Sequence, residues 1–282
     1  MKTLFKRHGK EENMIFAVDI GNSNIVIAVM DENKRVLSAK RIKTRKRAAT
    51  KDFISEIESV FGMTEGYLLL ENEIPMPREE IEGTVIASVV PEVTGKIRRA
   101  MESITEKEVL VVRNHIDPGL NIEMEMPTEK IGTDLLVDAA AAAEEHEGRI
   151  IVFDMGTSTT CSVVDNGTYI GTIIMPGVAI SHEALAQKAS QLPKVDFMAP
   201  ERLVGKHTVE SMQSGIIYAN AAMIDGLIKR VEDFIGGTAV VIATGGIAGL
   251  IVPHCEREII YEPDLLLKGL WYIYHKNSKV KV

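Results

Sequence analysis

The hydrophobic pattern of this chain contains one arrangement twice. Ile15–Asp31 (IFAVDIGNSNIVIAVMD) and Ile151–Asp165 (IVFDMGTSTTCSVVD) each have an apolar, β-branched run, a short polar tip and a second apolar run. Two such runs around a tip of turn residues predict a β-hairpin. In both segments an aspartate, a glycine and a serine occur at the same offsets: Asp19, Gly21 and Ser23, then Asp154, Gly156 and Ser158. The repeat predicts a chain of two similar halves.

The rest of the first half predicts alternating strands and helices. Thr50 is expected to cap a helix whose apolar residues recur at helical spacing and which ends at Gly62. Pro91 is expected at the first position of the next helix, where its missing N–H costs nothing. The other predicted elements are strands at 34–42, 83–90 and 109–112, a less regular link at 63–82, a loop or short extended piece at 115–127 and a helix at 132–147. This order fits a mixed sheet flanked by helices.

The second half predicts the same plan. A hairpin at 150–174 is followed by a Pro176-Gly177 turn, a helix to about Ser190 and a looser stretch at 191–207. The longest helix is expected at 208–234, where small and methionine residues suit either domain packing or a subunit interface. Its predicted apolar face consists of Met212, Ile216, Ala219, Met223, Leu227, Val231 and Phe234. A buried strand at 238–246 and a last helix from Pro263 complete the pattern.

Length and composition favour two folded domains. The chain has 282 residues, of which 45% are hydrophobic and 26% are charged, so it can bury substantial cores. We predict an N-terminal domain at 14–147 and a C-terminal domain at 148–282. Residues 1–13 are expected to form a disordered leader, unless the true start is Met14.

Charge and cysteine content argue against several classes of function. A formal net charge of −8 does not suit a nucleic-acid partner, and the basic cluster at 40–51 is expected to be a solvated turn and helix start. No apolar run is long enough for a membrane helix, and residues 1–13 have no secretory signal core, so a cytoplasmic protein is predicted. Two cysteines argue against a disulfide framework. Cys161 is expected in the core, and Cys255 with its neighbours lacks the spacing of a zinc site.

The hairpin tips carry the candidate chemistry. A glycine among small hydroxyl and amide residues lets backbone N–H groups approach an anion closely. The aspartate before each tip would repel phosphate but can hold a cation that neutralises it. One such tip alone would more often be an ordinary surface hairpin, whereas two copies predict a nucleotide clamp. The pair Gly245-Gly246 after a buried strand is commonly a tight turn, but beside two such hairpins it predicts a floor for the adenine and ribose.

The two hairpins and the glycine pair resemble the acetate and sugar kinase, Hsp70 and actin superfamily, whose duplicated ribonuclease-H-like domains bind ATP in the cleft between them. Within this superfamily the chain is similar to type III pantothenate kinases from about Ile15 to the last helix. The matching motifs are DIGNSN at 19–24, GTD at 132–134, DMGTSTT at 154–160, Pro176-Gly177, LPKV at 192–195, TVESMQSG at 208–215 and TGG at 244–246.

The resemblance implies the activity and the roles of particular residues. Members of that family phosphorylate pantothenate with ATP and magnesium in coenzyme A biosynthesis, need potassium or ammonium, and form homodimers. Asp134 would be the general base, Asp154 would coordinate potassium and Asp19 would lie near magnesium. The implied ATP-binding residues are Asp19, Ile20, Gly21, Asn22, Ser23, Asn24, Ile25, Val26 and Thr157, with Gly245 and Gly246 from the floor described above. The implied pantothenate-binding residues are Gly132, Thr133, Asp134, Leu135 and Thr208.

The sequence also departs from the family pattern near the implied acceptor site. Leu135 follows Asp134 where an arginine is common, and Met124-Glu125-Met126-Pro127 replaces an aromatic-Asp-Asn-Pro motif. Leucine cannot supply the bidentate bond of a guanidinium to a carboxylate. Two alternatives therefore remain beside a pantothenate kinase: a nucleotide-binding regulator without acceptor chemistry, or a kinase of another small hydroxyl substrate. From the residues alone, the favoured interpretation is that Thr133 or Asp134 caps the helix that follows.

Overall fold

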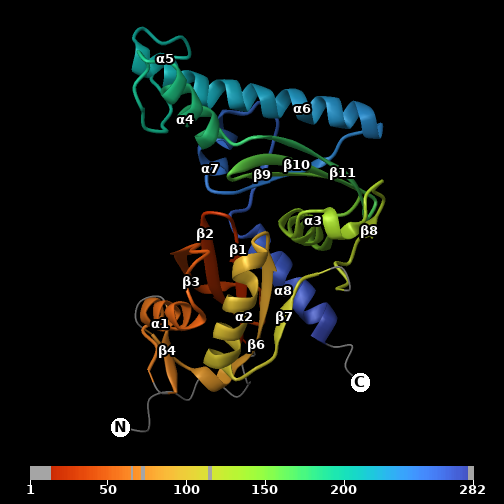
Figure 1. Cartoon of the computed structure of the whole chain (residues 1–282). Helices are drawn as coiled ribbons and strands as arrows, with labels where there is room; N and C mark the ends of the chain where they lie inside the picture. Colours follow the sequence, from red (N-terminus) through yellow and green to blue (C-terminus); the bar gives the residue numbers. More distant parts are fainter. Residues whose placement is uncertain (1–13, 65, 71–73, 114–115, 279–282) are drawn as a thin grey trace. The chain divides into compact units, whose positions relative to one another are not determined.

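The computed structural model describes residues 14–64, 66–70, 74–113 and 116–278. Its contacts separate the chain into two compact units (Figure 1). Among the described residues, unit 1 contains those within 14–118, 132–137 and 266–278, and unit 2 contains 119–131 and 138–265. The unit boundary therefore runs through helix α3 (Thr133–Glu145). The predicted domains, 14–147 and 148–282, follow the sequence repeat instead and stay a prediction, and the predicted leader lies outside the described residues.

Each unit is built on a mixed sheet, and the two sheets share one strand order. Unit 1 has the order β3-β2-β1-β6-β7, from strands β1 (Met14–Ile20), β2 (Asn24–Met30), β3 (Val36–Lys43), β6 (Ile81–Ser88) and β7 (Val109–Val111). Unit 2 has the order β11-β10-β9-β12-β13, from β9 (Arg149–Met155), β10 (Ser158–Asp165), β11 (Thr168–Pro176), β12 (Val240–Thr244) and β13 (Ile260–Tyr261), with β8 (Asn121–Ile122) beside β11. In both, three antiparallel strands are followed by two parallel ones. The predicted duplicated α/β fold and both hairpins are confirmed.

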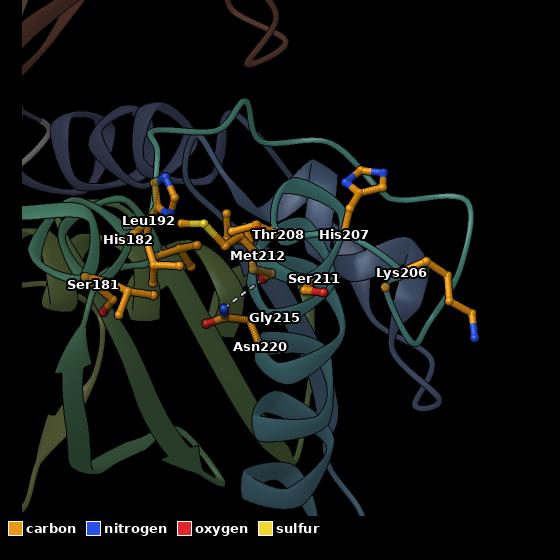
Figure 2. A pocket seen from close by; sticks show the side chains of 14 residues that line it. Ser181, His182, Leu192, Lys206, His207, Thr208, Ser211, Met212, Gly215 and Asn220 are labelled. Carbon is orange, nitrogen blue, oxygen red and sulfur yellow. Dashed lines mark hydrogen bonds between the residues drawn. The ribbon is translucent and has the colours of Figure 1, made fainter. Parts of the chain in front are cut away.

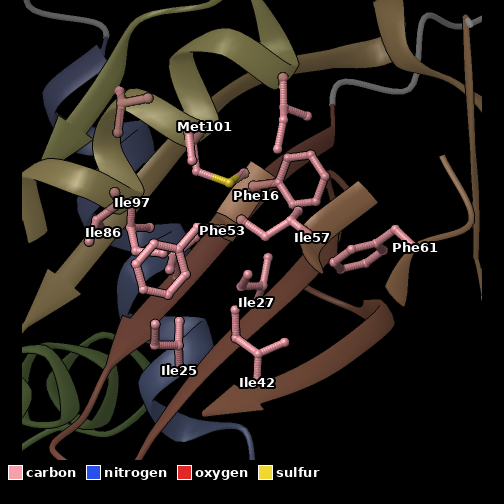
Figure 3. Close-up of a cluster of buried hydrophobic side chains, with 14 of the residues drawn as sticks. Phe16, Ile25, Ile27, Ile42, Phe53, Ile57, Phe61, Ile86, Ile97 and Met101 are labelled. Carbon is pink, nitrogen blue, oxygen red and sulfur yellow. The ribbon is translucent and has the colours of Figure 1, made fainter. Parts of the chain in front are cut away.

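The core of unit 1 lies between its sheet and two helices, α1 (Thr50–Val60) and α2 (Pro91–Thr105) (Figure 3). Alternate residues of β1, Phe16 among them, face these helices, and Phe16 meets the ring of Phe61 edge-on at 5.5 Å. Helix α8 (Leu265–Ser278) covers the other face. It packs so closely there that a side chain at Gly83 would collide with the hydroxyl of Tyr274. Helices on both faces bury every residue of the central strand β1 except Asp19, which is half-buried, and this is why the strand is almost entirely apolar.

Two details of unit 1 differ from the sequence prediction. Helix α1 has Ala49 as its N-cap, so Thr50 is its first residue and not its cap. The Asp52 carboxylate accepts the Ala49 N–H at 2.8 Å, which is the reciprocal bond of a capping box. The link at 63–82 contains a two-stranded ladder of β4 (Tyr67–Leu69) and β5 (Pro75–Pro77), which proline-rich composition concealed. Short 3₁₀ helices occur at Arg78–Glu80, Thr128–Lys130 and Val252–His254.

In unit 2 one face of the sheet packs against α4 (Val178–Lys188), α6 (Asn220–Ile235) and α7 (Ala248–Ile251), and α5 (Thr208–Ser214) precedes α6 in the chain. A π-helical turn, Gly215–Ala219, joins α5 to α6. Such a turn adds one residue to the helix, so the apolar face beyond it is displaced along the sequence. The predicted face is therefore partly wrong after Ile216: Val231 is buried as predicted, whereas Ala219 is exposed and Phe234 is 82% exposed. The other buried residues of α6 are Ala221, Ile224 and Ile228. In the part of the chain that the structure describes, no helix is long and apolar enough to span a membrane.

Candidate functional site

The first predicted phosphate loop is a tight turn between β1 and β2. The Gly21 N–H donates to the Asn24 carbonyl at 3.0 Å, and Asn22 and Ser23 between them are exposed. A Cβ atom at Gly21 would lie 3.2 Å from that carbonyl oxygen, so glycine lets the turn close. Asp19 lies half-buried at the end of β1, directly before the turn. Unit 1 thus has the predicted arrangement of a carboxylate followed by an exposed glycine turn.

The second loop, between β9 and β10, is packed against two other predicted motifs. Gly177 lies so close to the Thr157 carbonyl that any side chain there would overlap it. Gly245 has φ +93°, and a Cβ atom on it would lie 2.6 Å from Asp154 Oδ1. Thr244 also pairs with Asp154 across β12 and β9. The structure therefore brings together the Asp154 loop, the Pro176-Gly177 turn and the glycine pair, which the sequence presented as three separate motifs.

Both aspartates fit a cation that is shared with a phosphate. Among the described residues no group of three or more His, Cys, Asp or Glu side chains forms a metal cage. Magnesium commonly binds one or two protein carboxylates and completes its shell with water and substrate phosphates. One carboxylate at the base of each loop, Asp19 or Asp154, suits that mode of binding. Cys255 does not suit a metal, because burial raises the pKa of its thiol to about 12; the same holds for Cys161, which is buried in the core as predicted.

Asp134, the predicted general base, lies in the first turn of α3. Its carboxylate oxygen, Oδ1, accepts the N–H of Leu135 at 3.0 Å, and a Cβ atom on Gly132 would lie 2.5 Å from the same oxygen. Burial raises the pKa of Asp134, and the backbone hydrogen bonds oppose this change only in part. A raised pKa makes a carboxylate a better proton acceptor near neutral pH. The geometry is also consistent with helix capping, because the Leu135 N–H that donates to Asp134 is one of the first-turn N–H groups without a partner inside the helix.

Leu135 is buried, with 8% of its surface exposed. Its side chain belongs to the interior, and it cannot take the place of an arginine that reaches a substrate carboxylate. Thr133 is the first residue of α3 and is half-buried. The acceptor side of the site therefore keeps the family's glycine and aspartate but lacks a cation at position 135.

Thr208 lies on the wall of a cavity of about 670 Å³ in unit 2 (Figure 2). Apolar side chains and hydroxyl, amide and imidazole groups share its lining, which comes from α4, from the loops at 192 and 205–207, and from α5, the π-helical turn and the start of α6. The polar lining residues are Ser181, His182, Lys206, His207, Thr208, Ser211 and Asn220. Figure 2 shows the Lys206 side chain pointing away from the other labelled side chains. A mixed lining of this kind suits a small amphipathic ligand.

Buried polar groups hold the loops that line this cavity. Glu210 is 5% exposed, and its carboxylate accepts the Lys206 backbone N–H at 2.6 Å, with the Arg202 guanidinium at 3.6 Å. His182 Nε2 accepts the Val195 N–H at 3.3 Å and so fixes the loop that follows α4 against that helix. Sequence reasoning missed these residues, because a lone histidine or glutamate carries no spacing signal. Their only trace was that Glu210 and Val195 belong to the TVESMQSG and LPKV motifs.

The predicted site residues are divided between the two units. The Asp19 loop and the start of α3 belong to unit 1, and the Asp154 loop, the glycine pair and Thr208 belong to unit 2. The predicted nucleotide clamp requires residues of both units and stays a prediction.

Comparison with solved structures identifies the class of fold. The chain is similar to a candidate Baf family transcriptional activator from Campylobacter jejuni, with a TM-score of 0.54 and 16% identity. The match covers 94% of this chain and 100% of that one. A ROK family glucokinase from Streptomyces griseus, solved with glucose and AMPPNP, gives a TM-score of 0.51 at 13% identity, covering 94% of this chain and 100% of that one. The duplicated mixed sheet and these likenesses show that the chain has the same α/β fold as these two proteins.

Sequence relatives narrow the class to one family. A family model for type III pantothenate kinase matches residues 15–230. A type III pantothenate kinase of Exiguobacterium sp. is 35% identical over 94% of this chain and 100% of its own length. One from Bacillus cytotoxicus is 35% identical over 94% of this chain and 97% of its own. The chain belongs to the type III pantothenate kinase family.

Proposed function

We propose that this protein transfers the γ-phosphoryl group of ATP to the hydroxyl of pantothenate, which gives 4'-phosphopantothenate and ADP at the first step of coenzyme A biosynthesis. The observation that carries the proposal is the 35% identity to a type III pantothenate kinase over that relative's whole length. The exposed glycine turns after Asp19 and Asp154 support it, because phosphoryl transfer depends mainly on positioning and on neutralisation of charge.

The two loops have separate parts in the proposed reaction. The Asp19 loop would hold phosphate oxygens through backbone N–H groups, and Asp19 would bind magnesium shared with those oxygens. Asp154 would bind potassium or ammonium, and Thr157 beside it would contact ATP. Gly245 and Gly246 would lie under the adenine and ribose. Bound magnesium would neutralise the phosphate charge that builds up in the transition state.

Asp134 would act as the general base. Its carboxylate would accept the proton of the pantothenate hydroxyl while the hydroxyl oxygen bonds to the γ-phosphorus and the bond to the β,γ-bridging oxygen breaks. The burial that raises its pKa suits this role, since the base must accept a proton near neutral pH. Gly132 allows the carboxylate to lie close to the backbone, because a side chain at that position would meet Oδ1.

We propose that the cavity beside Thr208 receives the acceptor. Pantothenate has a branched apolar part, two hydroxyls, an amide and a carboxylate, and the cavity lining offers apolar walls with hydroxyl and amide groups. The buried Leu135 cannot bind the carboxylate of the substrate. Another small hydroxyl substrate is therefore the second candidate, and a substrate panel distinguishes it.

Thr208→Val should raise the KM for pantothenate about threefold to tenfold, as expected for the loss of one hydrogen bond. The KM for ATP should not change, because the substitution leaves the backbone of α5 intact. Steady-state kinetics with each substrate varied in turn measure both constants. Thr238→Val, at an exposed position before β12, is the matched control. An equal rise of both constants would contradict the role of Thr208 in acceptor binding.

We also propose that the protein is a homodimer and acts in the cytoplasm. Exposed apolar side chains of unit 2, such as Leu203 at 63% and Val204 at 73%, support a subunit interface. Both cysteines are free thiols, which suits a reducing compartment. Sedimentation velocity should give about twice the 31.0 kDa of one chain, and a monomer at micromolar concentration would refute the dimer.

The test of the proposed function is ADP release with the purified chain, ATP and magnesium. Turnover should depend on pantothenate and should rise when sodium is replaced by potassium or ammonium. Other small hydroxy acids, tested at the same concentration, should be poorer acceptors. ATP binding in calorimetry without pantothenate-dependent turnover would reject the proposal and favour a nucleotide-binding regulator, whereas a clear preference for another acid would favour the second candidate.

A further inference from the structure

Thr44, which follows β3, is bonded twice to the first phosphate loop. Its hydroxyl donates to the Gly21 carbonyl at 2.7 Å, and its N–H donates to the Ser23 carbonyl at 3.0 Å. Both bonds connect residues more than twenty positions apart, so they are tertiary and not part of the turn itself. Thr44 therefore bonds to both sides of Asn22, the exposed residue in the middle of the loop.

Further bonds engage the other carbonyl groups of the loop. The Ile20 carbonyl accepts the Val89 N–H at 3.1 Å, and the Asn24 carbonyl accepts the Gly21 N–H at 3.0 Å. With the two bonds from Thr44, four carbonyls between Ile20 and Asn24 accept hydrogen bonds from the protein. A carbonyl dipole directed at a phosphate would repel it, so fixing these oxygens against the protein removes the main obstacle to anion binding.

The bond from the hydroxyl also fixes the direction of one amide. The described residues contain no cis peptide bond, so the peptide between Gly21 and Asn22 is trans and its C=O and N–H point in opposite directions. Because the Gly21 carbonyl points at the Thr44 hydroxyl, the Asn22 N–H points away from Thr44. Without that bond the peptide could rotate, since glycine allows it and the loop is exposed. An amide that rotates binds phosphate less well than one held in place.

Thr44 is itself held in place by its neighbours. Lys43 pairs with Asn24 at the end of the β2–β3 ladder. The next two residues contact helices. Arg45 forms an ion pair with Glu56 of α1, and the Lys46 carbonyl accepts a hydrogen bond from the Lys96 ammonium of α2 at 2.6 Å. The basic cluster at 40–51 thus anchors the segment that carries Thr44, beyond being a solvated turn.

We infer that Thr44 is a positioning residue for the nucleotide: its hydroxyl orients the Gly21–Asn22 peptide so that the amide faces the ATP phosphates. The inference rests on the proposed function only in that this loop binds ATP. It does not depend on the identity of the acceptor.

Thr44→Val keeps the β-branched shape and the backbone N–H but removes the hydroxyl. The dissociation constant for ATP with magnesium, measured by calorimetry on the whole chain, should rise about threefold to tenfold, the range for one hydrogen bond. Thr44→Ser, which restores a hydroxyl, should return affinity to within about twofold of the parent chain. Thr105→Val is the matched control, since the Thr105 hydroxyl donates to the Met101 carbonyl at 2.8 Å within α2, away from the loop. That variant should bind ATP like the parent.

A positioning role also predicts a kinetic signature. In Thr44→Val the KM for ATP should rise while the KM for pantothenate stays constant, and thermal unfolding should match that of Thr105→Val. Unchanged ATP affinity in Thr44→Val would overturn the inference, as would equal weakening in all three variants. Calorimetry needs no acceptor, so a parent chain that binds ATP but does not phosphorylate pantothenate would refute the proposed function and leave the Thr44 comparison valid.

Discussion

Asp134→Asn should lower kcat for pantothenate phosphorylation by about 10²–10⁴-fold, the usual contribution of a positioned general base. Asparagine keeps the shape and an oxygen that can accept the Leu135 N–H, now bonded to the carboxylate at 3.0 Å. It cannot accept the proton of the substrate hydroxyl. Activity should fall without disappearing, because the phosphate loops and cations supply most of the charge neutralisation. Single-turnover measurements of ADP release determine the loss.

The same substitution should not destabilise the protein. Burial raises the pKa of Asp134 in the folded chain above its unfolded value. The folded state therefore binds the proton more tightly, so its stability is highest below the unfolded pKa and decreases as the pH rises through the folded pKa. Above the folded pKa the ionised carboxylate carries the whole cost of its burial, and asparagine removes it. The midpoint of thermal unfolding should equal or exceed that of the parent chain.

The pH dependence gives a second measurement on the same residue. The base must be ionised to act, so kcat/KM should fall in acid with a midpoint above the ordinary aspartate pKa, because burial raises it. Asp233→Asn, at an exposed position of α6, should leave both the rate and the acid limb unchanged. An unchanged kcat in Asp134→Asn, whose oxygen can still accept the Leu135 N–H, would instead support the capping alternative.

The sequence predicted the sheets well because their signal is local. Each apolar run with its glycine turn specifies a hairpin by itself, and the repeat in the sequence became the repeated order β3-β2-β1-β6-β7 and β11-β10-β9-β12-β13. The helical face after Ile216 was predicted only in part, because periodicity assumes a constant 3.6 residues per turn. One extra residue in the π-helical turn moves Phe234 to the surface, and no composition signal marks such a turn.

The candidate site can be proposed from the sequence where its residues lie in short motifs, but not where it depends on tertiary contacts. The Asp19 and Asp154 loops carry their glycine and carboxylate within three residues, so a sequence motif reveals them. Thr44 acts on a loop 23 residues earlier, and His182 reaches Val195 across the end of α4. Such bonds exist only after the sheet and helices have formed, and a threonine in a basic segment resembles any surface residue.

Gly245→Ala should damage both folding and catalysis. The residue has φ +93°, which side chains rarely adopt, and the new Cβ would lie 2.6 Å from Asp154 Oδ1 and 2.7 Å from the Met155 backbone. Strain and overpacking of this kind cost about 1–3 kcal/mol, so thermal unfolding should occur several degrees lower. Gly246→Ala is the control for stability, because a Cβ atom there has nothing within 4 Å.

The effect on catalysis follows from the position of Asp154. Any relief of the overlap must move the Asp154 carboxylate or the strand that bears it, and a displacement of about 1 Å at a binding group can reduce the rate about 10²-fold. Measured well below the unfolding midpoint, Gly245→Ala should show this loss together with a higher potassium concentration for half-maximal activation. Since general destabilisation would not change the potassium requirement of the folded fraction, an unchanged requirement would refute the proposed role of Asp154 in binding the monovalent cation.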